Sequence, residues 1–60
     1  MKSNWRVMPR EVAGRKFYQA YRLLDLCADN TEKNRETWGG YYSTEKEAAD
    51  IADWLNKEGV

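Results

Sequence analysis

The chain has 60 residues, with ten Lys and Arg, ten Asp and Glu, one cysteine and no histidine. A chain this short forms one small domain with one core, because two separate pieces would each bury too little apolar surface. We therefore expect a single domain over residues 1–60. A lone Cys27 without histidine excludes both an intramolecular disulfide and a tetrahedral Cys/His zinc site.

The charges are divided between the two parts of the chain. Residues 1–24 hold six basic side chains against one acid, whereas residues 25–60 hold nine acids against four bases. The two parts therefore carry net charges of +5 and −5, which cancel. We expect the folded surface to have a positive side and a negative side, which matters more for partners than the net charge.

Two strands are predicted in the basic part. Bulky apolar residues alternate with others over residues 5–8, and Pro9 ends this first strand at an edge or a turn. A connection that contains Gly14 leads to a longer second strand over residues 16–24, which is rich in aromatic residues. A helix over the same residues stays the alternative, since they also include alanine and leucine, which are good helix formers.

A third strand follows a polar loop. Residues 28–35 have no apolar residue larger than alanine and many turn formers, which predicts a surface loop. Residues 36–42 are predicted as a strand with Gly39 and Gly40 in its middle. Paired glycines in a strand mark either a β-bulge or a place where a ligand approaches the backbone, and we favour the bulge.

The clearest local signal is a capping box, Thr44 followed by Glu47, which predicts that a helix begins there. Gly59 is a suitable stop signal. The apolar stripe of this helix comprises Ala48, Ile51, Ala52 and Leu55. The sequence therefore predicts an α+β fold, in which a three-stranded antiparallel sheet, ordered first-second-third, packs against one C-terminal helix.

Side chains alternate between the two faces of a strand, so the second strand offers two candidate core faces. The face with Phe17 and Tyr21 is the more apolar, and we expect it to lie beneath the helix. This choice directs Tyr18 and Arg22 outward. The predicted core comprises Val7, Phe17, Tyr21, Leu23, Tyr41, Ile51, Ala52 and Leu55, with Trp54 at its margin.

The residue types that most enzymes need are missing. No histidine is present to transfer protons or to activate Cys27 as a nucleophile. Asp50 and Asp53 have the spacing of a solvated helix face, and the Gly39-Gly40 pair lacks the Lys-Ser/Thr that follows in a phosphate-binding loop. We expect no enzymatic activity, no cofactor, no metal and no small-molecule substrate.

The sequence also offers no sign of export or of membrane insertion. Lys2 and Arg6 are followed by no apolar run, and the longest uncharged stretch, residues 37–44, is too short to span a bilayer. We therefore expect no membrane association and a cytoplasmic location.

Two binding functions remain. A protein-interaction or accessory module, either self-associating as a homodimer or binding another protein, is favoured, because the net charge is zero and the aromatic residues exceed what a small core hides. The alternative is nucleic-acid binding, for example to DNA, through a basic outward face of the sheet. The residues predicted to contact DNA or a partner are Arg6, Arg15, Lys16, Tyr18, Arg22 and Arg35.

Two of these arginines have a structural alternative. Arg22 has Glu36 and Asp25 as possible ion-pair partners across strands. Arg35 has the role of tying the polar loop to the second strand, which we favour over a binding role.

The order of the elements, with Trp5-Arg6-Val7 early and residues 42–48 entering the helix, resembles the N-terminal arm-binding domains of tyrosine-family integrases and the plant GCC-box-binding domain. That resemblance implies a three-stranded sheet inserted into the DNA major groove. Residues 18–23, 34–41 and 52–56 are similar to segments of short uncharacterised bacterial proteins, often carried by mobile elements. This second resemblance implies a stand-alone accessory protein that accompanies DNA-handling machinery.

Overall fold

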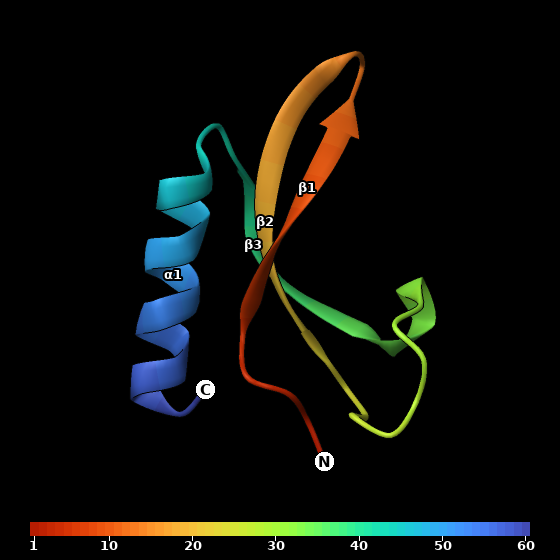
Figure 1. Cartoon of the computed structure of the whole chain (residues 1–60). Helices are drawn as coiled ribbons and strands as arrows, with labels where there is room; N and C mark the ends of the chain where they lie inside the picture. The colour runs from red at the N-terminus through yellow and green to blue at the C-terminus, as the bar shows by residue number, and fades with distance from the viewer.

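The computed structural model describes residues 1–60 and contains β1 (Arg6–Val12), β2 (Arg15–Leu23), the short 3-10 helix η1 (Glu32–Asn34), β3 (Arg35–Tyr42) and α1 (Glu45–Glu58). The strands form one antiparallel sheet in the order β1-β2-β3, and α1 lies along one face of it (Figure 1). The predicted α+β fold is confirmed, and the alternative of a helix in place of β2 is wrong.

A two-residue turn, Ala13-Gly14, joins β1 to β2 between the paired residues Val12 and Arg15. Both turn residues have positive φ angles, 52° and 77°, as the tightest hairpin turns require. β1 also continues through Pro9, where the sequence predicted its end. It can do so because β1 is an edge strand, on which a missing N–H need not break the pairing with a neighbour.

The pairing of β2 with β3 contains an irregularity, which lies between Tyr18 and Ala20. There, a single β2 residue, Gln19, lies opposite residues 39–41 of β3. Gly39 has a φ of 64°, a conformation that glycine adopts without the steric cost of a Cβ atom. The bulge predicted from the paired glycines is confirmed.

Helix α1 begins and ends at the predicted signals. The Thr44 hydroxyl accepts a hydrogen bond from the Glu47 N–H at 3.2 Å and donates one to the Glu47 carboxylate at 3.0 Å. Glu47 therefore holds the threonine hydroxyl rather than the threonine N–H of a standard capping box. At the other end Gly59 has a φ of 73°, and its N–H bonds to the carbonyl of Leu55.

The core consists of two clusters on opposite faces of the sheet. The buried members of the cluster between the sheet and α1 are Trp5, Ala20, Ala52 and Leu55, with Val7 and Ile51 packed against them. The members of the other cluster are Met8, Tyr21 and Leu23. Since Ala20 is the β2 residue beneath α1, the prediction that Phe17 and Tyr21 face the helix is wrong. The prediction that the core residues pack together in one cluster is also wrong, because they divide between the two faces of the sheet.

The size of the helix residues explains which face α1 covers. Ala48 and Ala52 are buried on α1, so the helix axis lies close to the sheet, and a gap of this width admits Ala20 rather than an aromatic ring. The rings of Phe17 and Tyr41 lie on the other side of the sheet, with their centroids 6.0 Å apart. Tyr41 is half-exposed, which corrects its place in the predicted core.

Candidate functional site

The face of the sheet that α1 leaves uncovered, called the open face below, is rich in arginine. On β1, Arg6 pairs with Tyr21 and Arg10 pairs with Phe17. The guanidinium of Arg15 lies 5.9 Å from the ring centre of Phe17, and that of Arg35 lies 5.7 Å from the ring centre of Tyr21. Because directly paired residues share one face of a sheet, the four arginines and the aromatic rings surround the same surface.

These four arginines have no acidic partner within the protein. The three ion pairs of the structure join Lys2 to Glu36, Arg22 to Glu36, and Lys46 to Asp50. Arg6, Arg10, Arg15 and Arg35 take part in none of them. Their charges are therefore available to an anionic partner.

The opposite side of the molecule is acidic. Helix α1 carries five acidic residues and two lysines along its 14 residues. The division of charge along the sequence is thus retained in part: the acidic helix lies opposite Arg6, Arg10 and Arg15, whereas Lys16 and Arg22 lie on the side of α1. Such an arrangement orients an anionic partner toward the open face before contact.

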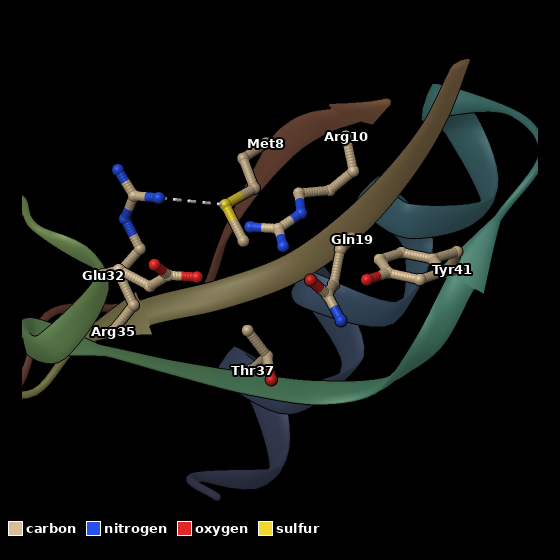
Figure 2. A pocket seen from close by; sticks show the side chains of 7 residues that line it. All are labelled: Met8, Arg10, Gln19, Glu32, Arg35, Thr37 and Tyr41. Atoms are coloured by element: carbon tan, nitrogen blue, oxygen red, sulfur yellow. Dashed lines mark hydrogen bonds between the residues drawn. The ribbon is translucent and has the colours of Figure 1, made fainter. Parts of the chain in front are cut away.

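A hollow of about 270 Å³ lies on the open face. Its walls come from β1, β2, β3 and η1, and the lining residues are Met8, Arg10, Gln19, Glu32, Arg35, Thr37 and Tyr41 (Figure 2). The guanidinium of Arg35 is fixed at the rim by a 2.8 Å hydrogen bond to Asn30 and by a weak one, 3.8 Å long, to the sulfur of Met8. The hollow is therefore a defined feature of the open face.

The predicted contact residues divide between the two faces. Arg6, Arg15 and Arg35 lie on the open face. Lys16, Tyr18 and Arg22 alternate in step with Ala20 and therefore lie on the side of α1. The prediction that Tyr18 and Arg22 point outward is wrong for the same reason that the core face is wrong.

Arg22 has a structural role instead. Its Nε donates to Glu36 at 2.6 Å, its Nη1 donates to the backbone oxygen of Val60 at 2.7 Å, and its guanidinium lies 4.5 Å from the ring centre of Trp5. The predicted alternative of an ion pair with Glu36 is confirmed. Arg22 thus joins β2 to β3 and to Val60, two residues beyond α1.

The position of Arg35 suits both of its predicted roles, the structural one and the binding one. Its hydrogen bond to Asn30 holds the loop before β3, and its guanidinium lies 5.7 Å from the ring centre of Tyr21 on β2, so the predicted tie between the loop and the second strand is confirmed. The same guanidinium also lines the hollow. A binding role for Arg35 stays a prediction.

Glu36 has a shifted pKa. The hydrogen bond from Arg22, together with the charges of Arg22 and Lys2, holds the pKa of Glu36 below its ordinary value of 4.5, against the opposing effect of desolvation. The carboxylate therefore stays ionised to lower pH in the folded chain than in the unfolded chain.

Acidification is expected to weaken the fold partly through Glu36. Because its pKa is lower in the folded state, the ionised carboxylate stabilises the fold above pH 4.5, and this contribution is lost as the pH falls through the folded pKa. Glu36→Gln should therefore melt below the parent at neutral pH and show a weaker loss of Tm on acidification. Thermal melts of both proteins between about pH 7 and about pH 3 measure this. Parallel loss of Tm in the two proteins would contradict it.

The sequence placed Arg10 in the hairpin loop at the rim of the basic face but left it out of the predicted contact residues, and it missed Gln19. Arg10 follows Arg6 on the same face at a spacing of four, but the prediction ended the strand at Pro9. Gln19 shares a strand face with Phe17 and Tyr21, which the sequence assigned to the core, so it was not predicted as a binding residue. A strand continued through the proline would have identified Arg10, whereas the hollow around Gln19 depends on the bulge and on η1.

The structure offers little support for a metal site, a reactive cysteine or a membrane-spanning helix. No group of three or more His, Cys, Asp or Glu residues is placed to hold a metal ion. Cys27 is exposed, and its N–H bonds to the Asp25 carboxylate. The only long helix, α1, is too short and too polar to cross a membrane.

Comparisons of the chain with protein-family models, with curated proteins and with solved structures give no match. The two resemblances drawn from the sequence therefore stay predictions.

Proposed function

We propose that the chain is a non-enzymatic module that binds nucleic acid through the open face of its sheet. The observation that carries this proposal is the presence of four arginines without acidic partners, Arg6, Arg10, Arg15 and Arg35, on the one face that α1 leaves uncovered. Arginine forms paired hydrogen bonds to phosphate oxygens and is the side chain best suited to this contact.

Aromatic rings between the arginines support the same proposal. Phe17 and Tyr41 lie side by side on the open face, with ring centroids 6.0 Å apart. Basic side chains that follow a phosphate backbone, combined with rings on which bases stack, are typical of surfaces that bind nucleic acid. The acidic helix on the opposite side favours one binding orientation.

The cytoplasmic location expected from the sequence stays a prediction.

Binding should weaken steeply with salt. If the four arginines each neutralise one phosphate, log affinity falls against log salt with a slope of about −3.6 for a duplex and about −2.8 for a single strand. Fluorescence anisotropy with mixed-sequence duplex and single-stranded DNA, over a range of salt concentrations, measures both slopes.

A pair of double variants with equal changes in charge tests the surface. Arg6→Gln/Arg15→Gln removes two exposed charges from the open face, and the duplex slope should become shallower by about 1.8. Lys46→Gln/Lys57→Gln removes two charges from α1 and should leave the slope unchanged. Absence of binding at low salt, or equal effects of the two variants, would overturn the proposal.

A second candidate function, the one that the sequence favoured, is self-association through two exposed tryptophans. Trp38 on β3 is 37% exposed and Trp54 on α1 is 48% exposed, with their ring centroids 6.3 Å apart. Adjacent exposed tryptophans are more common at protein interfaces than on the rest of a surface. They lie beside β3, whose outer edge has no neighbouring strand and can pair with a second copy.

Sedimentation at several concentrations tests this second candidate. We expect the average mass to rise with concentration and the rise to disappear in Trp54→Ala. Replacement of Tyr41, which is also half-exposed but lies on the open face, by alanine serves as the control and should leave the rise intact. A mass that stays at the monomer value throughout would remove this candidate.

A further inference from the structure

Gln19, at the centre of the open face, has an unusual environment for a polar side chain. The residue is only 7% exposed, yet its amide makes no hydrogen bond to any of the other residues that line the hollow (Figure 2). No fully buried side-chain nitrogen or oxygen in the protein lacks a partner, so solvent reaches the amide from the hollow. A ligand that displaces this solvent must bond the amide in turn, because a buried amide is costly to leave unbonded, so Gln19 favours ligands that form hydrogen bonds.

The groups around Gln19 offer both donors and acceptors. The Glu32 carboxylate accepts only, the guanidinium groups of Arg10 and Arg35 donate only, and the Gln19 amide and the Thr37 hydroxyl do both. Figure 2 shows the polar ends of Arg10, Glu32 and Gln19 turned toward the same hollow. Glu32 forms no ion pair with either arginine, so its acceptor oxygens remain available.

This mixture does not suit a simple anion. A phosphate in the hollow would meet Arg10 and Arg35, but it would also lie beside the carboxylate of Glu32, which repels it. A flat neutral group with its own donors and acceptors matches the lining better. The volume, about 270 Å³, is slightly below the roughly 300–1,000 Å³ of sites for drug-sized ligands, which favours a small flat group over a whole cofactor.

We propose that the hollow receives one unstacked base of a nucleic-acid strand, and that it selects a base with an exocyclic amine beside a ring-nitrogen acceptor, as in cytosine and adenine. This inference rests on the proposed nucleic-acid binding. Gln19 donates to the ring nitrogen and accepts from the amine, as in the paired contact that glutamine makes with adenine. Glu32 accepts the second hydrogen of the amine, as acidic side chains do with cytosine.

The surrounding residues fit this assignment. The ring of Tyr41 forms one wall of the hollow and has the ring of Phe17 beside it, which provides a surface for stacking the base. Arg10 and Arg35, at the hollow, and Arg6 and Arg15, farther along the sheet, bind the phosphates on either side. Specificity then comes from the Glu32 carboxylate, which can only accept, because the Gln19 amide can turn over to pair with either arrangement of donor and acceptor. Most of the affinity comes from the arginines.

The test compares two single strands that differ at this edge of the base. Oligodeoxycytidine and oligodeoxyuridine of about twelve nucleotides fall within the roughly 4–16 nucleotides that a small single-strand-binding domain covers. Cytosine presents an amine and a ring-nitrogen acceptor where uracil presents an oxygen and an N–H. We expect the protein to bind oligodeoxycytidine at least about fivefold more tightly, the lower end of what one good bidentate contact provides.

Two variants assign the preference to the hollow. Gln19→Met keeps the length of the side chain and removes its amide, and Glu32→Gln changes an exposed residue of η1, so the second variant stays folded even if the first does not. Glu32→Gln should bring the two affinities together, because a glutamine can donate to uracil as well as accept from cytosine. Gln19→Met should weaken the binding of both strands. Far-UV circular dichroism confirms that the variants compared are folded.

The outcomes separate this inference from the proposed function. Equal binding of the two strands by the parent, or a preference that survives Glu32→Gln, would overturn base selection while nucleic-acid binding stands. No binding of either strand, nor of duplex DNA, would overturn the proposed function and the inference with it. A preference for oligodeoxyuridine would show that the roles of donor and acceptor are reversed and would also overturn the inference.

Discussion

Replacement of Trp5 by alanine is expected to unfold a large fraction of the protein at room temperature. Its side chain is 4% exposed and packs between the sheet and α1. Truncation of a buried tryptophan costs about 3–5 kcal/mol, whereas a domain of 60 residues has a total stability of about 3–9 kcal/mol, at roughly 0.05–0.15 kcal/mol per residue. Urea denaturation followed by circular dichroism measures the loss.

Polar contacts of Trp5 add to the effect of the cavity. Its indole N–H donates to the backbone oxygen of Val60 at 2.8 Å, and the guanidinium of Arg22 lies 4.5 Å from its ring centre. Both contacts are lost in the alanine variant. The side-chain amide of Asn56 bonds to the backbone N–H and carbonyl of Trp5, and these two bonds do not depend on the indole.

Trp54→Ala is the matched control for this prediction. Trp54 is 48% exposed and contacts Trp38 edge to face, with ring centroids 6.3 Å apart. The same change of residue type should therefore cost much less free energy of unfolding at Trp54 than at Trp5. Equal losses in the two variants would contradict the placement of Trp5 between the sheet and the helix.

The elements of the fold were predictable because each has a local signal. The capping residue Thr44, the stop residue Gly59 and the apolar stripe between them define α1 over residues 45–58. The two glycines of β3 signal the bulge that the pairing confirms. These signals act over a few residues, so they can be recognised without knowledge of the tertiary structure.

The choice of the buried face was not predictable from strand composition. The face with Phe17 and Tyr21 is the more apolar one, but the small residues Ala48 and Ala52 bring α1 close to Ala20. Packing between the helix and the sheet therefore outweighs the hydrophobicity of the strand face. The small residues of the helix stripe indicate how close the helix lies to the sheet. The buried face of β2 can be predicted only when this stripe and the strand pattern are considered together.

The same error determined which site residues were found. When a strand face is assigned to the wrong side of the sheet, its charged residues are assigned to the wrong side as well. Arg22 was therefore predicted as a contact residue, whereas in the structure it bonds to Glu36 and Val60. Arg6 and Arg15 were predicted as contact residues and lie on the open face. The hollow around Gln19 brings together β1, β2, β3 and η1, and no local pattern in the sequence describes such a combination.

Leu55→Ala is expected to destabilise the protein by about 2–5 kcal/mol, and Ile51→Ala by clearly less. The sequence places both residues on the same apolar stripe of α1 and assigns them similar importance. In the structure Leu55 is 0% exposed and is the largest fully buried side chain, whereas Ile51 is partly exposed. The two truncations therefore differ in how large a cavity they leave, although both remove aliphatic side chains of equal size.

The difference between these two variants tests how α1 is rotated over the sheet. If α1 lies with Ala48, Ala52 and Leu55 against Ala20 and Trp5, urea denaturation should give a lower midpoint for Leu55→Ala than for Ile51→Ala, with similar slopes. A helix rotated toward Ile51 would reverse that order.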